Sequence, residues 1–181
     1  QLEAGSYPTS YIPNHSGGTI TRGAETPSNL SATSVIGQTE GTLFIDFLYE
    51  STASGNRFSI SDGTATNWVF IGTPESGTSS RFYIRVNSSV IVDVGASSYF
   101  VNGQQYKLAL AYKSGDWAAY GNGIQLYSGT NTIPSFSSPM DTINFKSYNP
   151  SDVITEREKV NQVLFFDTRL SNAELAALTT L

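Results

Sequence analysis

The chain contains no cysteine and only one histidine, His15, among its 181 residues. The absence of cysteine excludes disulfides, thiol catalysis and cysteine-ligated zinc. One histidine is too few for a histidine-rich metal site and argues against a Ser–His–acid triad. His15 lies near the start of the chain between Pro13 and Gly17, and we interpret it as a loop residue.

Charged residues are also scarce, at 14% of the chain, and the net charge is −5. This acidic balance, with no basic run, excludes the positive footprint of a nucleic-acid-binding protein. No uninterrupted apolar stretch reaches the length of about 18 residues that would indicate a membrane-spanning helix, so we expect no membrane insertion. The chain starts at Gln1 with neither a signal peptide nor an initiator Met, and we expect it to be an excised piece of a longer protein.

Aromatic residues make up 12% of the chain, and apolar residues repeatedly alternate with other residues. The clearest case is 42–50, where Leu43, Ile45, Phe47 and Tyr49 occupy every second position. Because successive side chains of a strand point to opposite faces, this pattern predicts a strand whose odd-numbered face is in the core. Similar segments, separated by turn residues, predict further strands at 57–61, 67–72, 81–86, 90–94, 106–112, 117–121, 124–127, 141–147 and 159–166.

One helix is predicted at the end of the chain, over 171–181. Ser171 and Glu174 have the spacing of a capping box. Leu175, Leu178 and Leu181 form one apolar stripe that would dock on a sheet. About ten short strands and one short helix predict an all-β fold, an antiparallel two-sheet jelly-roll sandwich.

Three segments resemble a known family. Residues 1–13 with 19–22 resemble the opening segment of concanavalin A-like (LamG-type) jelly rolls in phage structural proteins, such as head spikes, head fibres and tail fibres. Residues 111–123 are similar to the central hairpin of that family, and residues 164–175 to its closing strand and helix. The resemblance implies one domain over 1–181, with an opening segment at 1–22 and a capping helix at 171–181. It also implies glycan binding or virion attachment at a virion surface or another extracellular place.

Catalysis is the first functional hypothesis that we tested, because some jelly rolls are glycosidases or polysaccharide lyases. In the laminarinase-like branch of the resembled family, carboxylates stand at positions i, i+2 and i+4 of one strand. Here Asp46 and Glu50 have that spacing, but Leu48 stands between them. The histidine of the lyase signatures would have to be His15. We therefore expect no catalytic residues and no enzyme, with a divergent glycan-degrading enzyme as an alternative.

A calcium site is the second hypothesis, since related lectins hold Ca²⁺ in loops rich in Asp and Asn. The candidate ligands, each in or near a predicted turn, are Asp62, Asp93, Asp116, Asp141 and Asp152. Turn formation accounts for these aspartates without a metal. No cofactor is therefore assigned, and calcium remains an alternative.

A binding face is the third hypothesis, because sugar sites combine aromatic rings with polar groups at their margin. Strand alternation predicts that Trp68, Phe70, Tyr83 and Arg85 point away from the core. The resembled family's pattern, which places Trp117 in the core, implies the same for Tyr120. We expect these five side chains to line one groove on a concave sheet. Ala109 and Ala111 would form its hollow floor, and Asp46 could supply an acceptor. The alternatives are rings packed under a loop, or a subunit interface in a trimeric fibre.

These observations favour a non-catalytic, carbohydrate-binding adhesion module of a phage virion protein. Its expected partners are a glycan or polysaccharide and other virion proteins, with a homotrimer left open. The alternative is a purely structural domain that decorates the virion or oligomerises, because an aromatic patch buries as well against protein as against sugar.

Overall fold

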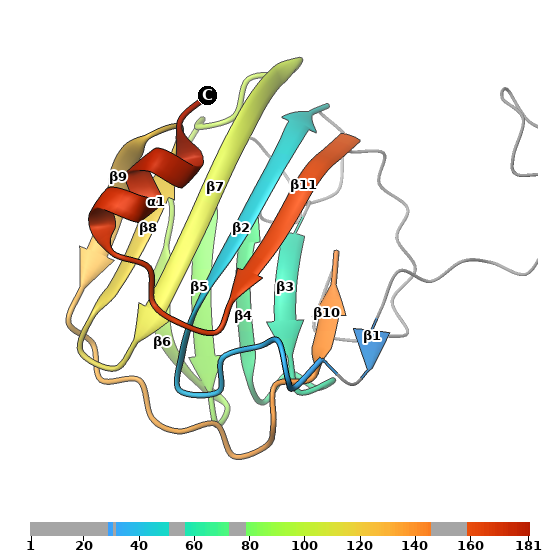
Figure 1. The fold of residues 1–181 in the computed structure, drawn as a ribbon, viewed down its shortest axis with the longest axis vertical. Coiled ribbons are helices and arrows are strands. Elements are labelled where there is room, and N and C mark those ends of the chain that lie inside the picture. Colours follow the sequence, from blue (N-terminus) through green and yellow to red (C-terminus); the bar gives the residue numbers. More distant parts are fainter. Residues whose placement is uncertain (1–28, 31, 51–56, 73–78, 146–158) are drawn as a thin grey trace, which may run out of the picture.

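Two antiparallel sheets face each other in the computed structural model, which describes residues 29–30, 32–50, 57–72, 79–145 and 159–181 (Figure 1). The six-stranded sheet contains, in spatial order, β1 (Asn29–Leu30), β10 (Thr142–Asn144), β3 (Arg57–Ser61), β4 (Trp68–Gly72), β5 (Arg81–Val86) and β6 (Ser89–Val94). The five-stranded sheet contains β11 (Lys159–Phe166), β2 (Glu40–Tyr49), β7 (Gln104–Lys113), β8 (Trp117–Gly121) and β9 (Ile124–Gly129). The predicted two-sheet jelly roll is confirmed, whereas His15, Asp152 and the opening segment 1–22 lie outside the described residues.

The hairpin between β5 and β6 shows how short polar turns connect these strands. Asn87 and Ser88 both have positive φ, 49° and 66°. Two consecutive residues with positive φ make the turn whose twist matches that of the flanking strands. The turn predicted across residues 87–89 is therefore confirmed, although β6 begins one residue earlier than expected.

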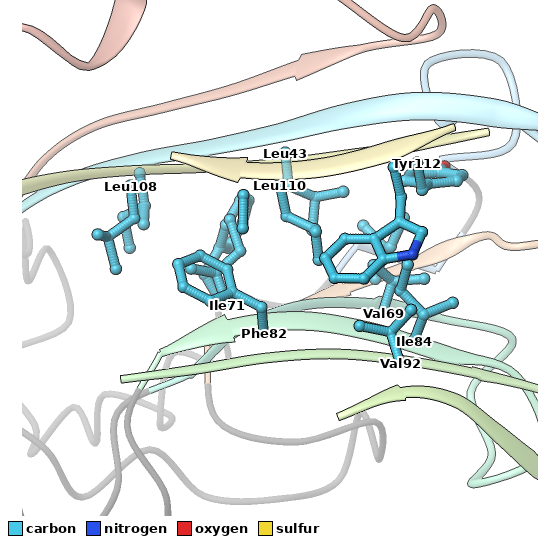
Figure 2. Packing of buried hydrophobic residues seen from close by; sticks show 14 of the residues in the cluster. Leu43, Val69, Ile71, Phe82, Ile84, Val92, Leu108, Leu110 and Tyr112 are labelled. Carbon is cyan, nitrogen blue, oxygen red and sulfur yellow. The ribbon is translucent and has the colours of Figure 1, made fainter. Parts of the chain in front are cut away.

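The core fills the space between the two sheets (Figure 2). Leu43 and the other odd-numbered apolar residues of β2 point into it, as the alternation predicts. From β7 come Leu108, Leu110 and Tyr112, and from the opposite sheet come Val69, Ile71, Phe82 and Ile84. We call the side of each sheet that faces this core its inner face, and the other side its outer face.

Tyr112 is a large, fully buried core residue that also carries a polar group into this layer. Its hydroxyl donates a hydrogen bond to the Gly37 carbonyl at 2.6 Å, and burial raises the pKa of Tyr112 far above its usual range. A Cβ atom at Gly41 would lie 2.6 Å from the same hydroxyl oxygen. The glycine therefore leaves the space that the tyrosine occupies.

Helix α1 (Asn172–Thr179) lies on the outer face of the five-stranded sheet, across β7, β8 and β9 (Figure 1). Its capping box is present: Ser171 accepts from the Glu174 backbone, and Glu174 accepts from the Ser171 backbone. Leu175 is fully buried against the sheet. Leu181, however, follows the last helical turn and is 65% exposed, so its predicted place in the docking stripe was wrong. Among the described residues, no helix has the length and apolar character needed to cross a membrane.

Candidate functional site

Three aromatic rings pack together on the outer face of the six-stranded sheet. Trp68 and Phe70 belong to β4, and Tyr83 belongs to β5, where it pairs with Phe70 across the strands. The Phe70 and Tyr83 rings stack with centroids 4.9 Å apart, and Trp68 lies 4.6 Å from Phe70 and 5.6 Å from Tyr83. These rings, which we call the ring cluster, are separate from the inter-sheet core. Alternation therefore correctly predicted the face on which they lie.

The predicted exposure of the rings was wrong. Phe70 is fully buried, and Trp68 and Tyr83 retain only 8% and 6% of their accessible surface. Part of the physical reason is that large rings on neighbouring strands remove water from one another, alongside further contacts of Trp68 and Phe70. The Arg81 guanidinium also covers two of the rings. Its central carbon lies 5.0 Å from the Tyr83 centroid and 5.5 Å from the Phe70 centroid. The cluster is thus a packed support, not an open stacking platform.

Polar side chains border the ring cluster. Arg81 binds Asp93 on β6 with two parallel hydrogen bonds of 2.8 and 2.9 Å. Arg85 faces Trp68 across the strands, and its side chain has no hydrogen bond or ion pair to any described residue. Among those residues the Tyr83 hydroxyl likewise lacks a hydrogen-bond partner. The margin of the cluster therefore offers a guanidinium and a hydroxyl to a ligand.

Tyr120 and Asp46 do not join this group, because their strands, β8 and β2, belong to the five-stranded sheet. Both lie on its outer face, on the opposite side of the sandwich from the ring cluster. The prediction that Tyr120 lines one groove with the other four residues, and that Asp46 supplies an acceptor to it, was therefore wrong. Alternation identifies which side of its own strand a residue occupies, but not which sheet receives the strand.

The hollow floor predicted at Ala109 and Ala111 is also absent, because helix α1 fills that place. Both alanines are fully buried in a cluster with Phe44, Tyr120 and Leu175. The small side chains allow the helix to approach the sheet closely. The Tyr120 hydroxyl donates to Gln125 at 2.8 Å, beside the start of the helix.

Asp46 is held by amides on both neighbouring strands. Its Oδ1 atom accepts from Gln105 on β7 at 2.8 Å and from Asn161 on β11 at 3.0 Å, and the residue is only 7% exposed. Glu50, the other acid of the tested catalytic pair, forms an ion pair with Lys159 at 2.9 Å. These acids therefore have structural partners on adjacent strands.

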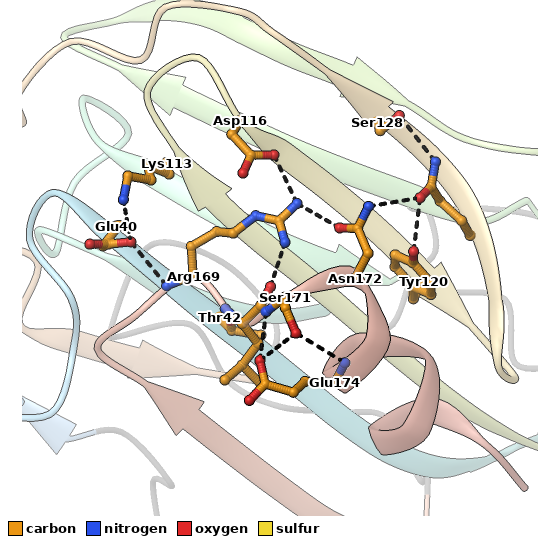
Figure 3. A network of polar contacts seen from close by, with 12 residues as sticks. Glu40, Thr42, Lys113, Asp116, Tyr120, Ser128, Arg169, Ser171, Asn172 and Glu174 are labelled. Atoms are coloured by element: carbon orange, nitrogen blue, oxygen red, sulfur yellow. Dashed lines mark hydrogen bonds and ion pairs between the residues drawn. The ribbon is translucent and has the colours of Figure 1, made fainter.

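A network of charged groups joins the start of helix α1 to two strands of the sheet (Figure 3). The Arg169 side chain is only 8% exposed and donates to Asp116 at 2.8 Å and to Asn172 at 2.7 Å. Its backbone N–H donates to Glu40, which also pairs with Lys113 at 3.2 Å. The network borders a cavity of about 490 Å³ lined by Lys113, Asp116, Arg169, Ser171, Asn172 and Glu174. Each cation there faces an acid, so the cavity presents little net charge to a ligand.

Two carboxylates of this network titrate below their usual range. The backbone N–H of Arg169 and the Lys113 ammonium hold the pKa of Glu40 low. The hydroxyl and the backbone N–H of Ser171 do the same to the pKa of Glu174. Both effects come from hydrogen bonds that favour the charged carboxylate.

The four described aspartates among the calcium candidates have protein partners. Asp62 accepts from the backbone and hydroxyl of Thr64 and from Asn67, which is the expected turn chemistry. Asp93 and Asp116 bind arginines, and Asp141 accepts from Thr142. Within the described part of the chain, no three His, Cys, Asp or Glu side chains gather where they could hold a metal ion.

Sequence reasoning missed three polar groups that shape these faces. Arg169 lies in the loop before the helix, and no local pattern marks it. Gln105 and Asn161 meet Asp46 only through the register of β7 and β11 with β2. Strand register, inferred from the alignment of apolar positions, is the signal that could have found these two amides.

No protein-family model and no curated protein matches the sequence. Solved structures match the fold. The IT-sialidase CBM40 of Ruminococcus gnavus, bound to alpha2,3 sialyllactose, is 14% identical with a TM-score of 0.66, covering 82% of this chain and 86% of that one. The SAP-like pentraxin of Limulus polyphemus is 14% identical with a TM-score of 0.60, over 85% of this chain and 77% of that one. Domain 4 of the arabinanase AbnA of Geobacillus stearothermophilus, in complex with arabinotriose, is 14% identical with a TM-score of 0.57, over 82% and 69%. The chain therefore shares the two-sheet jelly-roll fold of these structures.

Proposed function

We propose that this chain is a non-catalytic carbohydrate-binding module that uses the outer face of the six-stranded sheet. The observation that carries the proposal is the ring cluster, which lies outside the core and has the Tyr83 hydroxyl and Arg85 at its margin. Hydroxyl and guanidinium groups held on a rigid apolar support are suited to the directional hydroxyls of a sugar. Structural neighbours described with bound sialyllactose and arabinotriose support this reading of the fold.

The partners of Asp46 and Glu50 support a non-catalytic role. General acid–base hydrolysis of a glycoside needs two carboxyl groups that share one substrate. Here Asp46 is bound by two amides, and Glu50 is paired with Lys159. The proposed biological context, an adhesion role at a virion surface or another extracellular place, rests on the resemblance of residues 1–22, 111–123 and 164–175 to phage head and tail fibre domains.

The proposal is tested by glycan-array screening followed by titration with the sugars that bind. We expect weak dissociation constants, between about 1 μM and 1 mM. Tyr83→Phe removes one hydroxyl from the margin of the ring cluster, and it should weaken binding about threefold to tenfold.

Tyr120→Phe is the matched control, because it removes the same hydroxyl from the outer face of the other sheet. It should leave the affinity unchanged. A flat response to all glycans by a folded protein, with a stable trimer in solution, would favour the structural alternative. Loss of binding in Tyr120→Phe but not in Tyr83→Phe would place the site on the five-stranded sheet and contradict the proposal.

A further inference from the structure

Among the described residues, Arg85 has no counter-charge, unlike the other arginine beside the ring cluster. Its cross-strand neighbours are Trp68 on β4 and Val90 on β6, and both are apolar. Arg81, four residues earlier on the same face of β5, forms an ion pair with Asp93 at 2.8 Å. The difference follows from the register, since Asp93 pairs with Tyr83 and is thereby placed near Arg81.

The guanidinium of Arg85 is also partly removed from water. Its Nε atom is buried and makes no hydrogen bond with any described residue. The residue as a whole is partly exposed to solvent. A buried, unpaired donor on a charged group is unfavourable, and an acceptor supplied by a ligand would relieve that cost.

The local charge at this margin is opposite in sign to that of the whole chain. Arg81 and Asp93 pair with each other, which leaves Arg85 as a positive charge without an acidic partner among the described side chains, in a protein of net charge −5. A guanidinium presents parallel N–H groups that match the oxygens of a carboxylate or a sulfate. The Tyr83 hydroxyl, two residues earlier on the same face of β5, could contact a neighbouring sugar hydroxyl.

From these observations we infer that Arg85 selects saccharides that carry an anionic group, and that this group binds the Arg85 guanidinium at the Trp68 side of the ring cluster. The inference rests on the proposed carbohydrate-binding function and specifies the class of glycan. Carboxylates and sulfates share the required chemistry, and the experiment separates them.

The test compares saccharides of matched length with and without an anionic group: sialyllactose against lactose, and a sulfated against an unsulfated galacto-oligosaccharide. Titration of the whole chain should show about tenfold tighter binding of at least one anionic form than of its neutral partner. The preference should weaken as salt increases, because ions screen partly exposed charges.

Three variants assign the preference to Arg85. Arg85→Gln should lower the affinity for the anionic sugar to that for the neutral sugar, and Arg85→Lys should retain part of the preference. Lys159→Gln removes one positive charge from the other sheet and should leave the preference intact. Because a neutral sugar is titrated in parallel, loss of all binding in Arg85→Gln would point to misfolding, which circular dichroism of Arg85→Lys and Arg85→Gln would reveal.

Two results would overturn the inference in distinguishable ways. Equal binding of neutral and anionic sugars would show that the face binds glycans without Arg85 selecting for charge. The absence of binding to every sugar would overturn the inference together with the proposed function.

Discussion

At the scale of single residues, hydrogen bonds to Glu174 make the start of helix α1 sensitive to pH. The Ser171 hydroxyl donates to the Glu174 carboxylate at 2.6 Å and the Ser171 backbone at 2.8 Å, and these contacts lower the pKa of Glu174. A carboxyl group whose pKa is lower in the folded than in the unfolded state stabilises the protein above its unfolded pKa. This contribution is lost as the pH falls below about 4.5 and through the folded pKa.

We therefore predict that Glu174→Gln changes how thermal stability depends on pH. Glutamine can still accept from the Ser171 backbone, so the capping geometry is retained while the titrating group is removed. The wild-type chain should have the higher melting temperature at pH 7, and the difference should close as the pH falls from 5 toward 3. Thermal unfolding followed by circular dichroism measures this. A difference that stays constant across the range would show that the Glu174 charge contributes nothing.

The residues bordering the ring cluster show what sequence reasoning resolves at this scale. Alternation correctly separated Trp68 and Phe70 from Val69 and Ile71 along β4, because neighbouring side chains of a strand point to opposite faces. It could not show that the rings would bury one another, since exposure depends on neighbouring strands. The Arg81–Asp93 pair and the lack of a counter-charge at Arg85 likewise depend on cross-strand register.

At the scale of elements, helix α1 docks on the sheet through one fully buried leucine. Leu175 is completely buried against β7 and β8, whereas Leu181 is 65% exposed beyond the last turn. A leucine that is fully buried leaves a cavity when it is shortened, and an exposed one does not.

Leu175→Ala should therefore lower the free energy of unfolding by about 2–5 kcal/mol. Leu181→Ala is the matched control and should change it by no more than about 0.5 kcal/mol. Urea unfolding of both variants gives the comparison. Equal effects of the two substitutions would contradict the described docking of the helix.

Helix α1 also shows why the start of an element can be predicted from the sequence while the surface that it covers cannot. Ser171 and Glu174 indicated the start of the helix, because capping is a local interaction. The sequence around Ala109 and Ala111 indicated only that this face of β7 is hollow. That the helix fills this hollow, and covers Tyr120, is a long-range contact between the end of the chain and its middle.

At the scale of the whole molecule, the sandwich has two outer faces of different character. Helix α1 and the network around Arg169 cover part of the five-stranded sheet, and their charges are paired. The six-stranded sheet carries the ring cluster, with the Tyr83 hydroxyl and Arg85 at its margin.

The fold class could be predicted from the spacing of strands and turns, because alternation repeated over ten segments leaves few other architectures. The assignment of strands to sheets could not be predicted from that spacing, because it is decided by pairings between distant segments, such as β10 with β3 and β11 with β2.

The chain contains two tryptophans. Trp68 belongs to the ring cluster on the outer face of the six-stranded sheet, and Trp117 belongs to the core between the two sheets. Fluorine NMR of the chain labelled with 5-fluorotryptophan therefore reports on the proposed face and, in the same spectrum, on an internal control. A Trp117→Phe variant assigns the two signals. With a saturating amount of a glycan that binds, we predict that the Trp68 resonance shifts while the Trp117 resonance stays in place. A Trp68 resonance that does not move when the glycan is bound would contradict the proposal that the outer face of the six-stranded sheet is the carbohydrate-binding surface.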